Sequence, residues 1–156
     1  MKRGKLPRKV EARNAGRIRC GIVLSEYYEE ITGALLEGAL SILKNSGVAE
    51  KNIVIERVAG SFEIPYGCLR LLQSKKFDVI LTLGCIIKGQ TDHDRYITHA
   101  ISQGIINLTL KHGVPITFGV ITANNYRQAL ARSVGDMNKG REAAIAALSL
   151  FKDSPR

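Results

Sequence analysis

The chain has 156 residues, of which 45% are hydrophobic and 24% charged. This balance is typical of one folded globular domain and excludes disordered, collagen-like and disulfide-scaffold chains. No apolar run is long enough to cross a bilayer, and no apolar segment follows the basic first residues as in a secretory signal.

The net charge of +9 is concentrated at the start of the chain. Residues 1–19 hold eight Lys and Arg residues against one acidic residue, which gives +7, and the other 137 residues carry only +2. We interpret residues 1–17 as a solvated basic arm without a nucleic-acid partner, and residues 18–156 as a single domain. A polyanion-binding arm and an Arg-rich targeting segment are the alternatives.

The first half of the chain reads as two strand–helix units. Residues 20–24 and 53–58 are rich in β-branched residues and apolar on consecutive positions, as in strands buried on both faces of a parallel sheet. Between them, an apolar stripe from Ile31 to Ile42 has helical spacing and ends at Asn45-Ser46-Gly47. A second helix is expected to begin near Ser61, because Pro65 is tolerated only in a first turn.

The second half repeats this order. Strands are predicted at 78–83 and 116–121, on either side of a helix whose stripe runs from Ile97 to Leu108 and closes at Gly113. Asn124 or Asn125 can cap a short helix through Arg132, and a last helix is expected over 142–151 from a start near Asn138. Strand starts about 25–37 residues apart suit right-handed βαβ units.

Cysteine and histidine usage argues against a metal site. Cys20, Cys68 and Cys85 are an odd number without CxxC spacing, and the three histidines form no ligand set. Cys20 and Cys85 lie in apolar runs and are predicted to be buried thiols, so we expect a reducing, cytoplasmic setting. No cofactor is predicted.

Unusual residues cluster where the predicted strands end, which is where ligands bind in open α/β sheets. The three segments are 25–28, 59–63 and 84–93. The last nearly matches the nucleotide-binding loop GxxxxGK[ST], but Gln90 occupies the lysine position, so a P-loop enzyme is not expected. Thr91 can open a helix whose free amides bind a phosphate, or it can be a simple N-cap in an approximate capping box with Asp94.

Four side chains in or near these segments have both a functional and a structural interpretation. His93, in the first helical turn, can pass a proton near pH 7 or be a surface residue. Glu63 can bind a ligand or only complement a helix dipole. Tyr27 can stack on a planar heterocycle or cover the sheet edge, and Phe118 lies within a strand and would be core by default.

The chain resembles the 6,7-dimethyl-8-ribityllumazine synthase family over about residues 18–151. The resemblance rests on AGSFEIP at 59–65, LGCIIKGQTDH at 83–93, GVPITFGVIT at 113–122 and NKG at 138–140. It implies condensation of 5-amino-6-(D-ribitylamino)uracil with 3,4-dihydroxy-2-butanone 4-phosphate, with release of phosphate and water. The fold expected is an α/β three-layer sandwich, with a four-stranded parallel flavodoxin-like sheet flanked by helices.

The resemblance also implies roles for individual residues. His93 would transfer protons, Gln90 and Thr91 would bind the phosphate, and Tyr27 would stack on the uracil ring. The ribityl chain and the ring pocket would be lined by Ser61, Phe62, Glu63, Cys85, Ile86 and Ile87. Phe118, Arg132 and Lys139 would come from a neighbouring subunit, so a homo-oligomer is expected, with a pentamer as the minimum unit.

Two other functions remain open on the sequence alone. One is an inactive flavin- or lumazine-binding module that uses Tyr27 and Phe118 as stacking groups. The other is a structural shell or polyanion-binding assembly built on the basic arm. His93 and Arg132 favour the enzyme, because a pure binder needs neither a proton shuttle nor a phosphate clamp.

Overall fold

The computed structural model of the chain describes residues 4–152. Within them the strands are β1 (Cys20–Ser25), β2 (Ile53–Val58), β3 (Val79–Ile87) and β4 (Ile116–Ala123). The helices are α1 (Glu29–Asn45), α2 (Ile64–Ser74), α3 (His93–His112), α4 (Tyr126–Ala131) and α5 (Lys139–Ser149). Among residues 4–152, no helix is both long enough and apolar enough to span a membrane.

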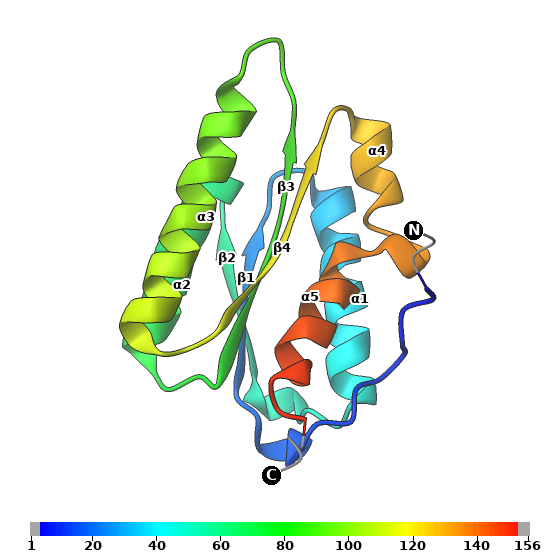
Figure 1. Ribbon diagram of the computed structural model, residues 1–156, viewed down its shortest axis with the longest axis vertical. Coiled ribbons are helices and arrows are strands. Elements are labelled where there is room, and N and C mark those ends of the chain that lie inside the picture. Colours follow the sequence, from blue (N-terminus) through cyan, green and yellow to red (C-terminus); the bar gives the residue numbers. More distant parts are fainter. Residues whose placement is uncertain (1–3, 153–156) are drawn as a thin grey trace.

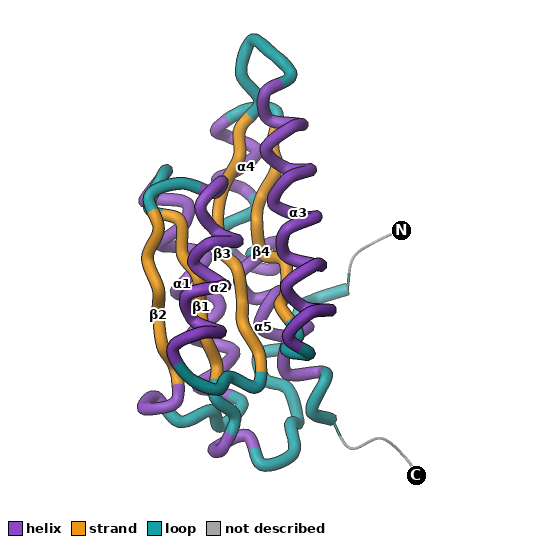
Figure 2. Tube along the Cα trace, turned by 90° about the vertical axis from the view of Figure 1, so that its left-hand side faces the viewer, coloured by secondary structure: helices purple, strands orange, loops and turns teal. Residues whose placement is uncertain are grey.

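The strands form one parallel sheet in the order β2-β1-β3-β4. Helices α2 and α3 cover one face, and α1, α4 and α5 cover the other (Figures 1 and 2). Each face buries its own apolar cluster, so the sheet is the middle of three layers. The predicted α/β three-layer sandwich is confirmed.

Strand β3 is longer than the sequence predicted. It was expected to end at residue 83, but it continues to Ile87 and pairs with β4 as far as Ala123. Gly84 was read as part of a loop, and it lies inside the strand instead. A Cβ there would come within 2.7 Å of Ser61 Oγ, so this glycine permits close packing rather than a turn.

The predicted helix ends are largely confirmed. Gly47 and Gly113 adopt left-handed conformations after α1 and α3, and the Asn125 and Asn138 side chains accept bonds from the first turns of α4 and α5. The start of α3 differs from the predicted capping box.

Helix α3 begins at His93 after Asp92, whose side chain makes no capping bond. The Thr91 hydroxyl accepts only the His93 amide, at 3.4 Å. Asp94 Oδ1 is buried and has no hydrogen-bond partner within residues 4–152, so it forms no capping box with Thr91.

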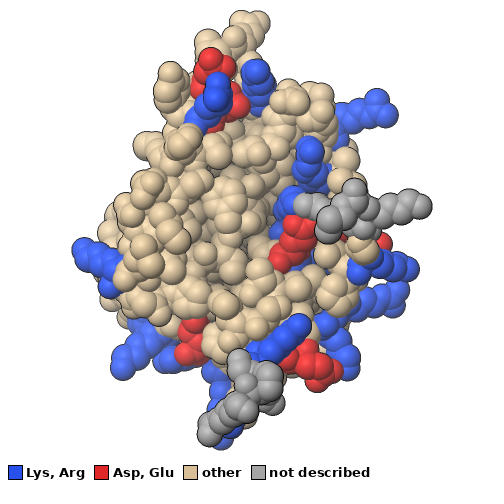
Figure 3. Space-filling model, in the orientation of Figure 1, with Lys and Arg blue, Asp and Glu red and all other residues tan. Residues whose placement is uncertain are grey.

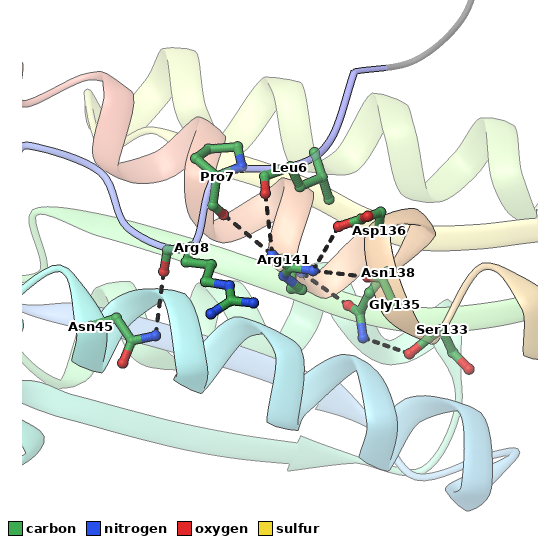
Figure 4. A network of polar contacts seen from close by, with 9 residues as sticks. All are labelled: Leu6, Pro7, Arg8, Asn45, Ser133, Gly135, Asp136, Asn138 and Arg141. Carbon is green, nitrogen blue, oxygen red and sulfur yellow. Dashed lines mark hydrogen bonds and ion pairs between the residues drawn. The ribbon is translucent and has the colours of Figure 1, made fainter.

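The basic arm is not a free tail over the residues that the structure describes. Val10 is only 5% exposed, and its amide donates to Ser46 Oγ at 2.8 Å. Arg141 of α5 reaches the carbonyls of Leu6 and Pro7 (Figure 4). The expectation of a solvated arm is therefore wrong for its backbone, because one apolar side chain and several main-chain bonds hold it on the domain.

The cationic side chains of the described part of the arm, residues 4–17, nevertheless stay exposed. In Figure 3 Lys and Arg gather at the right and lower margins of the face, whereas its centre carries few charges. The centre of this face is therefore not a strongly charged surface.

An ion pair joins the amino-terminal ends of β1 and β3. The Arg19 guanidinium donates to both carboxylate oxygens of Asp78, at 3.0 and 3.1 Å, and the Arg19 amide donates to the same carboxylate at 2.8 Å. The Asp78 amide in turn donates to the Arg19 carbonyl. Together these bonds set the register of the two central strands.

Replacing Asp78 with asparagine should destabilise the protein at neutral pH. Hydrogen bonds from Arg19 hold the pKa of the Asp78 carboxyl below its usual value, so the folded state favours the carboxylate. That stabilisation is present above the unfolded-state pKa and is lost as the pH falls through the folded-state pKa. The free energies of unfolding of parent and variant should differ at pH 7 and converge below about pH 4. A difference that did not change with pH would contradict this role.

Candidate functional site

A pocket of about 240 Å³ lies where β1, β2 and β3 end. Its lining residues come from the connections after β1 and β2, from the last residues of β3 and from α3: Tyr27, Tyr28, Gly60, Ser61, Phe62, Glu63, Cys85, Ile86, Ile87 and Ile97. Seven of the thirteen predicted site residues are among them. A larger open hollow of about 580 Å³ lies elsewhere, beside Arg8 and Arg141, and contains none of the predicted residues. The smaller pocket is therefore the candidate site.

Main-chain bonds beyond the strands bring the first two segments together. The Glu26 amide donates to the Val58 carbonyl and the Tyr27 amide to the Ala59 carbonyl, so the chain after β1 continues to pair with the chain after β2. This pairing sets Tyr27 beside Gly60. A short 3₁₀ turn, η3 (Ser61–Glu63), then leads into α2.

Ser61 and Glu63 are used differently in the folded chain. The Ser61 side chain is nearly buried, and its hydroxyl donates to the Cys85 carbonyl at 3.3 Å, which ties η3 to the end of β3. Glu63 is exposed, and its carboxylate lies so close to Gly60 that a Cβ there would come within 2.9 Å of Oε2. The hydroxyl therefore positions the backbone, while the carboxylate remains available to a ligand.

The Cys85 thiol lies at the pocket as a neutral group. Burial raises its pKa to about 11, so it is protonated at neutral pH and is a poor nucleophile. Cys20, Cys68 and Cys85 are all free and buried, which confirms the prediction made for Cys20 and Cys85. Among residues 4–152, no three His, Cys, Asp or Glu side chains meet as a metal-ligand set.

Two aromatic rings at the pocket are largely exposed. Tyr27 is 64% and Phe62 60% exposed. Large apolar side chains that project around a hollow are typical of a surface that binds a ligand or a partner. Their planar faces suit a flat heterocycle.

Gln90, Thr91 and His93 lie beside the pocket rather than in its lining. Gln90 and Thr91 belong to the exposed connection between β3 and α3, and His93 is the exposed first residue of α3. Ile97 lines the pocket and follows His93 by four residues, so both lie on one face of the helix. This arrangement puts His93 one helical turn before Ile97, at the amino-terminal end of α3.

Phe118, Arg132 and Lys139 do not line the pocket of their own chain. Phe118 was expected to be core by default, but it is 43% exposed because β4 is an edge strand. Arg132 follows α4 and is half-buried, and Lys139 Nζ pairs with Glu142 at 2.7 Å. None of the lining residues is a lysine or an arginine, so a phosphate bound here would need positive charge from outside the pocket.

Tyr28, Gly60 and Ile97 line the pocket but were not predicted as site residues. Ile97 was part of an apolar helical stripe and gave no other signal. Gly60 lies directly before the predicted Ser61. Tyr28, like Gly60, lies in one of the segments predicted at the strand ends, and that position was the signal for it.

The chain is similar in sequence to known proteins of one family. The sequence model of the family described as 6,7-dimethyl-8-ribityllumazine synthase matches residues 17–154. Proteins of that name from Phocaeicola vulgatus and Christiangramia forsetii are 42% and 44% identical to this chain, each over 88% of it and 83% of the relative. The protein of the same name from Bacteroides fragilis is 40% identical over 86% of this chain and 94% of its own length.

Proposed function

The chain belongs to the 6,7-dimethyl-8-ribityllumazine synthase family, and on this premise we propose how its pocket performs the family's reaction. The enzyme condenses 5-amino-6-(D-ribitylamino)uracil with 3,4-dihydroxy-2-butanone 4-phosphate to form 6,7-dimethyl-8-ribityllumazine, phosphate and water. One observation carries the assignment of the site: seven of the residues predicted to bind substrate line a single pocket at the carboxyl ends of the strands.

The pyrimidine is proposed to bind in the pocket itself. Tyr27 stacks on the uracil ring, and main-chain groups of Cys85, Ile86 and Ile87 border it. Phe62 and Glu63 flank the ribityl chain, and Ser61 holds the two segments together. The substrate amine attacks the ketone of the butanone and forms an imine, so no lysine nucleophile is needed.

The phosphate is proposed to bind at the start of α3. The side chain of Asp92 makes no capping bond there, and the Thr91 hydroxyl contacts the His93 amide only at 3.4 Å. An anion can replace this long contact at the start of a twenty-residue helix, where the helix dipole favours it. Gln90 and Thr91 lie directly before these amides. His93 moves protons during phosphate elimination, dehydration and ring closure.

A second copy of the chain is proposed to complete each site. The lining residues carry one carboxylate and no cation, whereas the leaving phosphate needs a guanidinium or an ammonium group. Phe118, Arg132 and Lys139 of the adjacent subunit supply the remaining contacts, and we infer a pentamer as the minimum unit. Three free, buried thiols support a cytoplasmic location.

The experiment that tests the function mixes the two substrates with purified protein and follows the absorbance of the lumazine. We expect lumazine formation that depends on both substrates, with release of one phosphate per lumazine. Tight lumazine or flavin binding without turnover would instead identify a binding module. Solution mass measured on the same sample tests the pentamer, and a monomer with full turnover would contradict the shared site.

Replacing Arg132 with alanine should chiefly weaken binding of the butanone phosphate. A charge-assisted contact to phosphate contributes about 1.5–3 kcal/mol, so KM for this substrate should rise about 10- to 100-fold. KM for the pyrimidine should change far less. An unchanged KM for the butanone phosphate would remove Arg132 from the site.

A mixing experiment tests where Arg132 acts. If Arg132 and His93 of different subunits form one site, unfolding and reassembling the Arg132→Ala and His93→Ala variants together should restore part of the parent activity. Each variant reassembled alone is the control. Activity no greater than the mean of the two controls would place both residues in the site of one chain.

A further inference from the structure

Three tyrosine rings form a continuous cluster at the edge of the pocket. The ring centroids of Tyr27 and Tyr28 are 4.6 Å apart with an interplanar angle of 70°, an edge-to-face contact. The centroids of Tyr28 and Tyr126 are 6.2 Å apart at 58°. Both distances fall within the range of about 4.5–7 Å in which aromatic rings attract each other. Tyr28 is thus held between the Tyr27 ring and a ring from a distant part of the chain.

The backbone of Tyr28 is in an unfavourable conformation for its side chain. Its φ of 61° and ψ of 60° lie in the left-handed region, where a bulky residue is an outlier and glycine or asparagine is common. The Tyr28 carbonyl accepts the Ile31 and Thr32 amides, each at 2.9 Å, and so begins α1. These bonds hold the Tyr28 backbone at the start of α1, with the Tyr28 side chain at the pocket that it lines.

The far side of the cluster is also fixed. The Tyr126 hydroxyl donates to Glu30 Oε2, which joins the first turn of α4 to the first turn of α1. This hydrogen bond raises the pKa of Tyr126, so its hydroxyl remains a donor at neutral pH. Tyr126 therefore cannot turn away from Tyr28 without breaking a charge-assisted bond.

The ring of Tyr27 needs such support. Because it is 64% exposed, few contacts other than the Tyr28 ring restrict its rotation. A stacking ring that is already oriented loses less conformational freedom when the ligand binds. We propose that Tyr28, backed by Tyr126 and Glu30, is a positioning residue that sets the plane of the Tyr27 ring for stacking on the pyrimidine substrate. The inference rests on the proposed function for the identity of that substrate.

The test replaces Tyr28 with asparagine. Asparagine suits the left-handed backbone, so this variant removes the ring without adding backbone strain, and the strain it relieves offsets part of the lost packing of Tyr28 against the core. We expect Kd for 5-amino-6-(D-ribitylamino)uracil, measured by calorimetry, to rise about two- to tenfold. This factor corresponds to the usual interaction free energy of an edge-to-face pair of rings. KM for the pyrimidine should rise in parallel, while KM for the butanone phosphate stays within twofold of the parent.

Two further variants separate positioning from general damage. Tyr28→Phe keeps the ring and should restore the affinity of the parent. Tyr126→Phe breaks the bond to Glu30. It should also raise Kd for the pyrimidine, but by less than Tyr28→Asn does. Parent-like affinity in Tyr28→Asn, an equal loss for both substrates, or a loss that Tyr28→Phe does not restore would each overturn the proposal.

The binding measurement also distinguishes this proposal from the proposed function. If the parent binds the pyrimidine but forms no lumazine, the function fails, and the three variants still decide the role of Tyr28. If the parent turns over normally and Tyr28→Asn binds like it, only the positioning role fails. A parent that does not bind the pyrimidine would overturn both.

Discussion

Replacing His93 with alanine should slow turnover about 10²- to 10⁴-fold, the range that general acid–base catalysis contributes. Much of the acceleration should remain, because holding two reactants together supplies a separate entropic advantage. Folding and assembly should be preserved, since the imidazole is exposed and the hydrogen bond to Thr91 comes from the His93 main chain. The measurements are kcat with both substrates at saturation and the solution mass of the variant.

His99 provides the matched control on the same helix. It is also an exposed histidine of α3, but it lies six residues further on, about 240° around the helix from His93. His99→Ala should leave kcat unchanged. Equal turnover in the parent and in His93→Ala would remove His93 from the reaction, whereas an equal loss in both variants would indicate damage to α3.

Replacing Gly140 with alanine should destabilise the protein by about 3 kcal/mol or more. Gly140 lies in the first turn of α5, where that helix crosses α1, and a Cβ there would come within 1.9 Å of the Leu35 carbonyl oxygen. The next two contacts are also main-chain atoms of Leu35, so no side chain can rotate to make room. The two helices would have to separate, and chemical denaturation should report the loss as a lower midpoint.

Gly33→Ala is the control for this prediction. Gly33 is also a helical glycine, in α1, but a Cβ there meets nothing within 4 Å. Alanine should therefore stabilise the protein by about 0.5–1 kcal/mol through the unfolded state. A Gly140→Ala variant as stable as the parent would show that α5 and α1 can separate at little cost in free energy.

Local chemistry explains which parts of the fold were predictable. Helix ends at Gly47 and Gly113 follow from left-handed glycines, and the starts of α4 and α5 follow from asparagine caps at Asn125 and Asn138. These signals depend on a few neighbouring residues. The buried strands were predictable in the same way, because each is a run of consecutive apolar residues.

The errors arose where distant parts of the chain decide the structure. Gly84 suggested a turn, but its role is to admit Ser61 against β3. Val10 is one apolar residue in a basic segment, and it is buried because it joins a core cluster built from residues far along the chain. Phe118 has an ordinary strand environment in the sequence, yet the edge position of β4 leaves it exposed.

The candidate site also has a part that local sequence predicts and a part that depends on distant contacts. Residues on the three strand-end segments were predicted together because parallel strands end at one edge of the sheet. The contact of Tyr126 with Glu30 joins residues 96 positions apart, and no pattern in the sequence indicates it. Tyr28 lies in one of these segments, but the sequence does not indicate its left-handed backbone, which is rare for a tyrosine.

The Arg19–Asp78 pair and the pocket occupy opposite poles of the sheet. They are separated by the length of β1, six residues or about 20 Å. Sites this far apart that share no partner usually contribute to stability independently. Substitutions near Arg19 and Asp78 can therefore raise or lower the thermal stability of the protein while the turnover rate stays the same.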